Sequence, residues 1–269
     1  MRLTQLRVVG SGSTIEIYKY NEDHPLAYDF QIVGNKSRER IEVVDEQSRL
    51  RKIESRKRSL QRTKTNLRRL VNTNAWMWKK PNGKYYLPTF ATFTFKEDIQ
   101  DVKTANWFFS AFIKRLNEYV HGERKNVLRY VVVPEFQKRG AVHFHAVFFN
   151  LSYVLNDSLE VIWGNGMVRI KAIRHVDNVG AYITKYMSKE FEDHRLDGLK
   201  HYSSSRGLIR PTEIRNEKIA ERIVERIPKK YLVREKEFES QHQGKVIYQQ
   251  FKLGKHMSLA DFMPKSTSV

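Results

Sequence analysis

Two histidines on one short apolar segment are the first side chains in this sequence that suggest chemistry. His143 and His145 flank Phe144 among residues typical of a β-strand. Successive side chains of a strand point to opposite faces, so both imidazoles should share a face that Phe144 does not. Two imidazoles placed in this way can bind one metal ion. Two partly buried strand histidines with ordinary hydrogen-bond partners would give the same pattern.

A carboxylate joins these histidines in only one of two possible hairpin registers. A three-residue loop at 138–140, with its glycine left-handed, pairs Glu135 with His143 and puts both on one face. A two-residue loop pairs Phe136 with His143 instead and turns Glu135 away. Two histidines and one carboxylate leave coordination positions open and are compatible with manganese, magnesium or zinc. The first register therefore predicts a catalytic metal site at Glu135, His143 and His145.

The segment 179–189 carries two tyrosines and two lysines at helical spacing. Tyr182 and Tyr186 lie four residues apart, and so do Lys185 and Lys189. A nearby ammonium group favours the phenolate form of tyrosine, and a metal ion can polarise a phosphodiester for in-line attack. The product would be a covalent phosphotyrosine. An amphipathic helix with its tyrosines on a sheet and its lysines in solvent is the structural alternative.

The composition limits the chemistry and the partners. The 269 residues include 49 Lys and Arg against 30 Asp and Glu, a net charge of +19, which favours nucleic acid over membrane as the partner. The absence of cysteine excludes thiolate metal sites and a cysteine nucleophile. No P-loop motif occurs, which argues against a fused ATP-driven helicase. Without a membrane-spanning apolar run or a signal-peptide core, the sequence predicts a cytoplasmic protein.

The elements that must position the candidate residues predict an α+β fold. The expected strands are 89–95, 128–135, 142–149 and 167–173. The expected helices are 105–120, 155–163 and 177–191. Their order is β-α-β-β-α-β-α, which indicates a central antiparallel sheet covered by helices.

Three parts are expected along the chain. Residues 1–85 should form a short hairpin and a long basic helix at 36–71, and residues 86–195 should form the domain with the histidines and tyrosines. Residues 196–269 should add an α/β extension with a loose tail after Met257. Both flanking parts are rich in Lys and Arg and are expected to contact DNA. A solvated helix face packed along one apolar seam is the alternative for the basic helix.

Taken together, these motifs resemble the HUH endonucleases, in particular the rolling-circle replication initiators (Rep proteins) of plasmids and small phages. The segments that carry the resemblance are 92–95, 135–145 and 182–189, together with a turn at 163–166 and the segment 205–208. The resemblance implies an antiparallel sheet with the metal-binding histidines on a central strand and the tyrosine helix laid across it.

The resemblance also implies a reaction. Single-stranded or hairpin origin DNA would be nicked at one site through a 5′-phosphotyrosyl intermediate, and the strand would later be rejoined. His143, His145 and Glu135 would bind a divalent metal ion, Mn²⁺ or Mg²⁺, and Tyr186 would be the nucleophile, with Lys189 beside it. The host helicase and polymerase would be partners.

Other residues and functions have more than one interpretation. Tyr182, with Lys185 nearby, matches the two-tyrosine form of phage initiators or is structural. The basic side chains expected at the DNA are Arg56, Lys57, Arg58, Arg139 and Arg206. A transposase or relaxase of the same superfamily would use the same chemistry. A non-catalytic module for single-stranded nucleic acid would bind without metal and without a covalent adduct.

Overall fold

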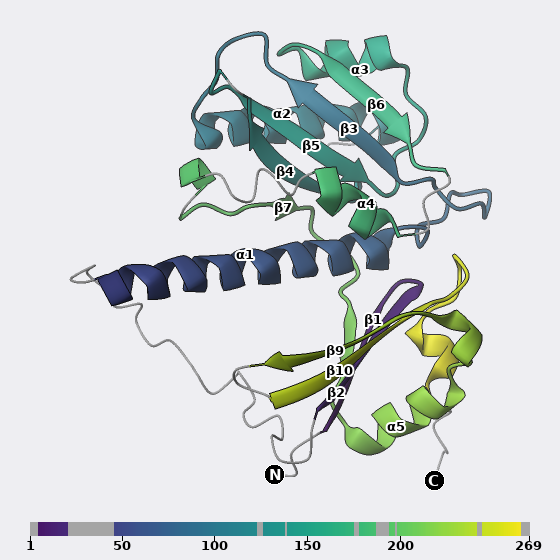
Figure 1. Ribbon diagram of the computed structural model, residues 1–269. Coiled ribbons are helices and arrows are strands. Elements are labelled where there is room, and N and C mark those ends of the chain that lie inside the picture. The colour runs from purple at the N-terminus through teal and green to yellow at the C-terminus, as the bar shows by residue number, and fades with distance from the viewer. Residues whose placement is uncertain are drawn as a thin grey trace. The chain divides into compact units, whose positions relative to one another are not determined.

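The protein, seen in a computed structural model, is an α+β protein with two antiparallel five-stranded sheets (Figure 1). The structure describes residues 5–20, 46–122, 126–137, 139–174, 178–186, 194–196, 198–240 and 244–264. Two compact units are present: a central unit of residues 63–210, and a terminal unit of residues 1–62 and 211–269. The α+β fold class expected from the sequence is confirmed.

The central unit contains a sheet with the strand order β6-β3-β5-β4-β7. Its strands are β3 (Thr89–Thr94), β4 (Tyr130–Phe136), β5 (Val142–Phe148), β6 (Val168–Ala172) and β7 (Ser203–Ser204). Its helices are α2 (Val102–His121), α3 (Asn156–Trp163) and α4 (Val179–Tyr186), together with the last part of α1 (Glu46–Asn74). From β3 to α4 the elements follow the predicted order β-α-β-β-α-β-α.

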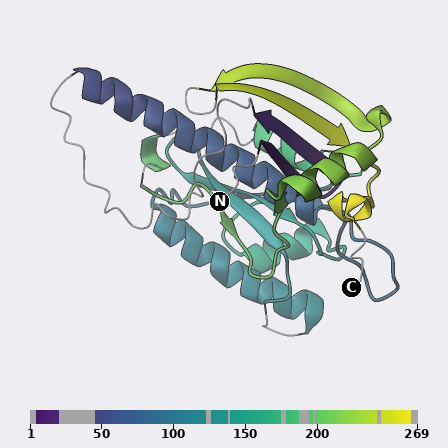
Figure 2. The same ribbon diagram turned by 90° about the horizontal axis from the view of Figure 1, so that it is seen from below.

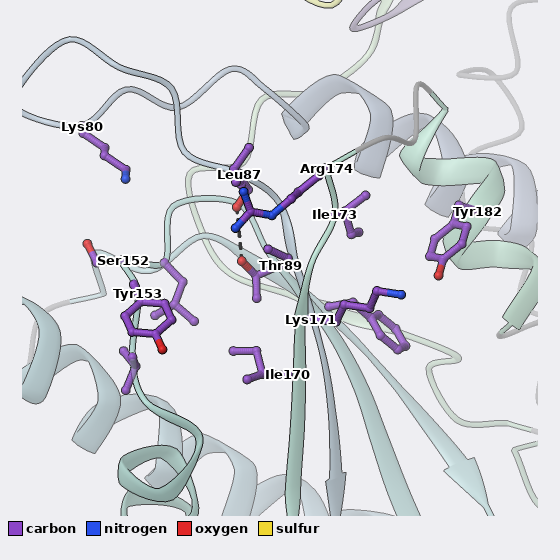
Figure 3. A pocket seen from close by; sticks show the side chains of 14 residues that line it. Lys80, Leu87, Thr89, Ser152, Tyr153, Ile170, Lys171, Ile173, Arg174 and Tyr182 are labelled. Carbon is purple, nitrogen blue, oxygen red and sulfur yellow. Dashed lines mark hydrogen bonds between the residues drawn. The ribbon is translucent and has the colours of Figure 1, made fainter.

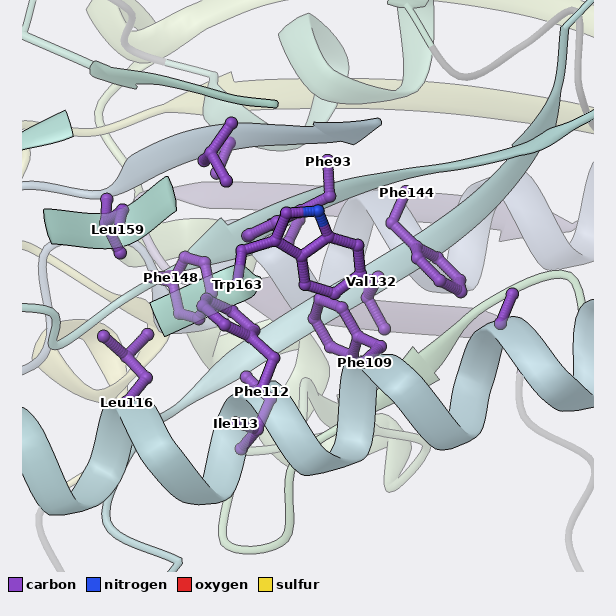
Figure 4. Packing of buried hydrophobic residues seen from close by; sticks show 14 of the residues in the cluster. Phe93, Phe109, Phe112, Ile113, Leu116, Val132, Phe144, Phe148, Leu159 and Trp163 are labelled. Atoms are coloured by element: carbon purple, nitrogen blue, oxygen red, sulfur yellow. The ribbon is translucent and has the colours of Figure 1, made fainter. Parts of the chain in front are cut away.

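An aromatic core fills the space between one face of this sheet and α2 (Figure 4). The ring of Phe93 lies 4.9 Å from that of Phe112 and 5.3 Å from that of Trp163, measured between centroids. Helix α2 begins where the Asp101 side chain accepts a hydrogen bond from a backbone amide, and it ends at Gly122, whose φ of 68° is left-handed. This layer covers one face and leaves polar strand residues on the other.

A tight turn at the end of α3 anchors the end of β3. Nε1 of Trp163 donates to the carbonyl oxygen of Thr94 over 3.2 Å, and the amide of Lys96 donates to the carbonyl of Asn165 over 2.8 Å. A Cβ atom on Gly166 would lie only 2.3 Å from the Thr94 oxygen. Glycine is therefore required where this turn meets the strand.

Helix α4 begins against the end of α1 without an intervening side chain. The amide of Gly180 donates to Oδ1 of Asn72 over 2.6 Å, and Nδ2 of Asn72 donates to Oδ1 of Asn178 over 2.9 Å. A Cβ atom on Gly180 would lie 2.2 Å from the carbonyl oxygen of Arg68. The glycine thus permits the close approach that positions the start of α4.

The terminal unit contains a sheet with the strand order β8-β1-β2-β10-β9, built from both ends of the chain. Its strands are β1 (Leu6–Ser11), β2 (Thr14–Tyr20), β8 (Thr212–Ile214), β9 (Leu232–Ser240) and β10 (Gly244–Lys252). Helix α5 (Glu217–Arg226) lies beside β1 and covers an apolar face of this sheet (Figure 2).

The C-terminal segment and the basic helix match the expectations only in part. The tail after Met257 is not loose throughout, because Leu259–Phe262 forms a short 3₁₀-helix that begins with a capping box and buries Leu259 and Phe262. The basic helix is confirmed from Glu46 onwards, and residues 36–45 lie outside the described ranges.

The compact units have other bounds than the three expected parts, because β2 pairs with β10 across most of the chain. The division at 85/86 and 195/196, and the DNA contacts assigned to the flanking parts, stay predictions. Among the described helices, none is long and apolar enough to cross a membrane.

Candidate active site

The hairpin between β4 and β5 has the three-residue loop that places the carboxylate beside the histidines. The amide of Gln137 donates to the carbonyl of Ala141 over 2.9 Å, Gly140 has a φ of 97°, and Glu135 pairs directly with His143. The register expected for a shared face is confirmed, and the two-residue loop is wrong. The face opposite the aromatic core therefore carries both histidines and the glutamate.

His145 is held on three sides by neighbouring strands. Its Nε2 atom contacts Oε2 of Glu135 on β4, and its Nδ1 atom lies 3.1 Å from Oγ1 of Thr92 on β3. The ring of Phe90 stacks on the imidazole at 5.6 Å between centroids and 7° between planes. The His145 and Glu135 side chains are 15% and 29% exposed. The ring orientation is thus restrained while the pair stays open to solvent.

His143 has a different environment on the same strand. Its Nε2 atom is buried and has no hydrogen-bond partner within the described part of the structure. Burial lowers the pKa of His143, although the nearby Glu135 carboxylate acts in the opposite direction. The imidazole is therefore neutral at pH 7 and has a nitrogen available to a ligand.

These donors are of the type that binds divalent metal ions, but they are not gathered around one point. Among the described residues, no three His, Asp or Glu side chains are arranged as a complete metal site. Glu135 lies against His145, while the buried nitrogen of His143 lacks a partner. An ion would satisfy that nitrogen and would compete for the Glu135 carboxylate. The residue types thus fit a metal ion, whose binding stays a prediction.

Helix α4 carries the first of the two candidate tyrosines beside this face. Val179 and Ile183 are fully buried, whereas Tyr182 is half-buried and lines a cavity together with Lys171 and Phe90 (Figure 3). The backbones of Lys185 and Tyr186 form the end of α4, but their side chains, and all of Lys189, lie outside what the structure describes. The nucleophile assignment stays a prediction.

The basic side chains expected at the DNA lie in both units. Lys57 and Arg58 are exposed and Arg56 is half-buried, all in the part of α1 that belongs to the terminal unit. Arg139 and Arg206 are exposed in the central unit, and Nη2 of Arg139 donates to the carbonyl oxygen of Phe95 over 3.3 Å. Their contacts with DNA stay predictions.

Phe90 and Lys171 belong to the site but were not singled out from the sequence. Phe90 lies two residues before Thr92 and so shares its face, and Lys171 pairs with Phe90 on the neighbouring strand. The alternation in 89–95 carries the signal for Phe90. The pairing of β6 with β3, which places Lys171 there, is a long-range contact that no local pattern specifies.

Comparison with known proteins points to the same segment. Residues 88–191 match the sequence model of a family described as replication-associated protein of the ORF2 type. The match indicates a Rep-type replication initiator. It extends from the residue before β3 past the end of α4, and so includes the candidate metal ligands and both candidate tyrosines. No curated protein and no solved structure matches the chain.

Proposed function

We propose that this protein initiates rolling-circle replication by nicking and rejoining single-stranded origin DNA through a tyrosine of α4. The observation that carries this proposal is the shared face of Glu135, His143 and His145, in the segment that matches a replication-associated family. The two tyrosines at helical spacing lie in the same segment. The net charge of +19 favours a nucleic-acid substrate.

The ligands of a divalent ion, Mn²⁺ or Mg²⁺, would be the Nε2 atoms of His143 and His145 and the carboxylate of Glu135. When bound, the ion would polarise the scissile phosphodiester. Nδ1–H of His145 would then donate to Oγ1 of Thr92, which orients the ring with its Nε2 lone pair toward the ligand. Stacking by Phe90 would restrain the same ring.

The proposed nucleophile is the phenolic oxygen of Tyr186. This oxygen forms a bond to phosphorus while the bond from phosphorus to the 3′ oxygen breaks. The phenol loses one proton and the 3′ oxygen gains one, giving a 5′-phosphotyrosine and a free 3′-hydroxyl that can prime synthesis. The ammonium groups of Lys185 and Lys189 would favour the phenolate. In the reverse step, a 3′-hydroxyl attacks the phosphotyrosine and rejoins the strand.

The partners in this scheme are the origin DNA, single-stranded or in a hairpin, and the replication machinery of the host. Unwinding and synthesis would come from a host helicase and polymerase. Tyr182 would be either a second nucleophile or a residue that contacts the substrate. Both roles keep it at the same face as the histidines.

Covalent capture of DNA tests this function. Single-stranded oligonucleotides that tile the replicon encoding the chain are incubated with the full-length protein and Mn²⁺, Mg²⁺ or chelator, and denaturing gels detect the adduct. We expect a metal-dependent adduct that is lost in Tyr186→Phe and kept in Tyr119→Phe, an exposed tyrosine of α2.

The remaining variants separate the other outcomes. Loss only in the Tyr182→Phe, Tyr186→Phe double variant would mean that the two tyrosines substitute for each other. No adduct on a strand that the protein binds would contradict the proposal and favour a binding module. Transposon-end and transfer-origin oligonucleotides test whether another reaction of the same superfamily is preferred.

A further inference from the structure

A cavity of about 860 Å³ opens where β3 begins and β6 ends (Figure 3). This volume is within the range of about 300–1,000 Å³ that is typical of small-molecule sites. Much of its lining is apolar and includes Leu87, Ile170 and Ile173. Such a lining favours the flat, weakly polar face of a ring over a hydrated ion.

The charged groups of the cavity are all cationic. Lys80, Lys171 and Arg174 line it, and no Asp or Glu is among the described lining residues. Figure 3 shows the Arg174 side chain reaching toward the middle of the cavity, with Lys80 and Lys171 further from its centre. A ligand with an apolar ring and an anionic group would match this combination.

An aromatic side chain that the core does not use stands at the cavity. Tyr153, in the loop between β5 and α3, is 88% exposed and lines the cavity. Tyr153 and Tyr182 lie on opposite sides of β6, so aromatic rings border the cavity on two sides (Figure 3). Exposed tyrosines next to cations are typical of surfaces that stack unpaired bases.

The cavity is continuous with the candidate active site. Phe90 lines the cavity and stacks on His145, and Lys171 pairs with Phe90 across the sheet. A single aromatic ring therefore separates the cavity from an imidazole of the metal-binding face. A ligand in the cavity would lie next to the DNA phosphate that the site is proposed to cleave.

We propose that this cavity binds an unstacked nucleotide of the single strand that flanks the nicked phosphate, and that it contributes to sequence selection. This inference rests on the proposed nicking function. The base enters the apolar part and stacks on Tyr153, while Lys80, Lys171 and Arg174 contact the flanking phosphates. A base within a duplex is already stacked and paired, so the cavity selects single-stranded DNA.

Selection from a random pool tests the proposal without knowledge of the origin. Single-stranded oligonucleotides with a randomised central segment are bound to the full-length wild type, and the retained strands are sequenced. Tyr153→Ala and Lys171→Gln are treated in the same way. The matched controls are Tyr119→Ala and Lys114→Gln, which change exposed residues of α2.

We expect Tyr153→Ala to lose the base preference at one position, or at two adjacent positions, and to bind the selected strand about five- to hundredfold more weakly. Lys171→Gln should weaken binding at every sequence and reduce its salt dependence. Both controls should behave as wild type. Because Tyr153 is exposed, its truncation leaves the fold intact, which circular dichroism can verify.

The proposal is overturned if Tyr153→Ala retains wild-type affinity and base preference, or if the wild type enriches no strand. It is also overturned if free deoxynucleoside monophosphates bind as tightly as the selected strand, because the site would then take nucleotides rather than DNA. Adduct formation separates this inference from the nicking function. An intact adduct with an unchanged preference in Tyr153→Ala rejects only the cavity, whereas a selected strand without any adduct rejects only the nicking.

Discussion

The two units are both five-stranded antiparallel sheets, but their polar strand residues are satisfied in different ways. In the terminal unit, Glu16 is 1% exposed and accepts a hydrogen bond from the Tyr248 hydroxyl over 2.9 Å. Nε of Arg7 lies 2.6 Å from a Glu213 oxygen. In the central unit, the buried Nε2 atom of His143 has no partner among the described residues.

This difference separates structural polar groups from candidate functional ones. A buried polar group that finds a partner inside the protein contributes to stability and leaves little capacity for a ligand. A buried nitrogen without a partner costs stability unless a ligand satisfies it. Polar residues on a sheet therefore indicate a functional site only when their hydrogen-bonding capacity is left unused.

The largest effect should come from His143→Ala. We expect adduct formation to slow by at least about a thousandfold, because metal-assisted charge stabilisation contributes several kcal/mol. Stability should change little, since the removed nitrogen makes no hydrogen bond with the described residues. Gel-based adduct kinetics and urea unfolding measure the two quantities.

Tyr248→Phe is the matched control in the other sheet. It should lower the free energy of unfolding by about 1 kcal/mol, because it removes the hydrogen bond to Glu16, and should leave adduct formation unchanged. Wild-type adduct kinetics in His143→Ala would mean that this histidine is structural and would remove the distinction between the sheets.

Core truncations test whether the two units unfold separately. All four tryptophans lie between residues 76 and 163, so tryptophan fluorescence reports on the central unit. Phe93→Ala, in the aromatic core, should lower the stability measured by this signal by about 3–5 kcal/mol.

Ile17→Ala in the terminal unit should cost about 2–5 kcal/mol there. This cost should appear in hydrogen exchange of β1 and β2 without shifting the tryptophan transition. A tryptophan transition shifted equally by both variants would show that the two sheets unfold as one.

Gly180→Ala should have a smaller effect that is confined to the central unit. The added methyl group meets the Arg68 carbonyl oxygen at 2.2 Å, so the start of α4 must shift away from α1. We expect a loss of about 1–3 kcal/mol in stability and a lower rate of adduct formation, because the tyrosines move with the helix. Ala181→Gly, at the next position, is the control for helix propensity, with an expected cost of about 1 kcal/mol. An unchanged adduct rate in Gly180→Ala would argue against the importance of this contact.

The smallest expected effect concerns Glu213 in the terminal unit. Burial raises the pKa of its carboxyl group, but the hydrogen bond from Arg215 and the charge of Arg7 prevail and hold it below its ordinary value of 4.5. A lowered pKa in the folded state contributes stability above the unfolded-state pKa, and this contribution is lost as the pH falls through the folded-state value. Glu213→Gln should therefore cost about 0.5–1 kcal/mol at pH 7, since the pair is partly exposed. Urea unfolding at several pH values should show the difference disappearing on acidification, and a difference that grows instead would contradict this account.

Local patterns were sufficient to predict much of the central unit. Alternation in β5 and the glycine of the hairpin loop together predicted the shared face of Glu135 and His143. Helical spacing and terminal glycines predicted α2 and α3 to within a few residues. These features depend on residues close together in the sequence, where side-chain period and turn geometry act directly.

Features that depend on distant residues could not be predicted in this way. The contact of Gly180 with Arg68 and the placement of Lys171 beside Phe90 depend on how helices and strands pack. The sheet formed by residues 6–20 with residues 212–252 requires a choice of strand edges. Local propensity does not determine that choice, because many pairings bury similar apolar area.

The pairing of β2 with β10 has a consequence for synthesis of the chain. The hairpin at residues 6–20 leaves the ribosome long before its partner strands exist, and at about 5–20 residues per second the wait for residue 212 is roughly 10–40 s. The central unit, whose elements are contiguous in sequence, can fold during that interval. The N-terminal hairpin must meanwhile stay unpaired along two strand edges, which exposes it to chaperone binding or misassembly in the nascent protein.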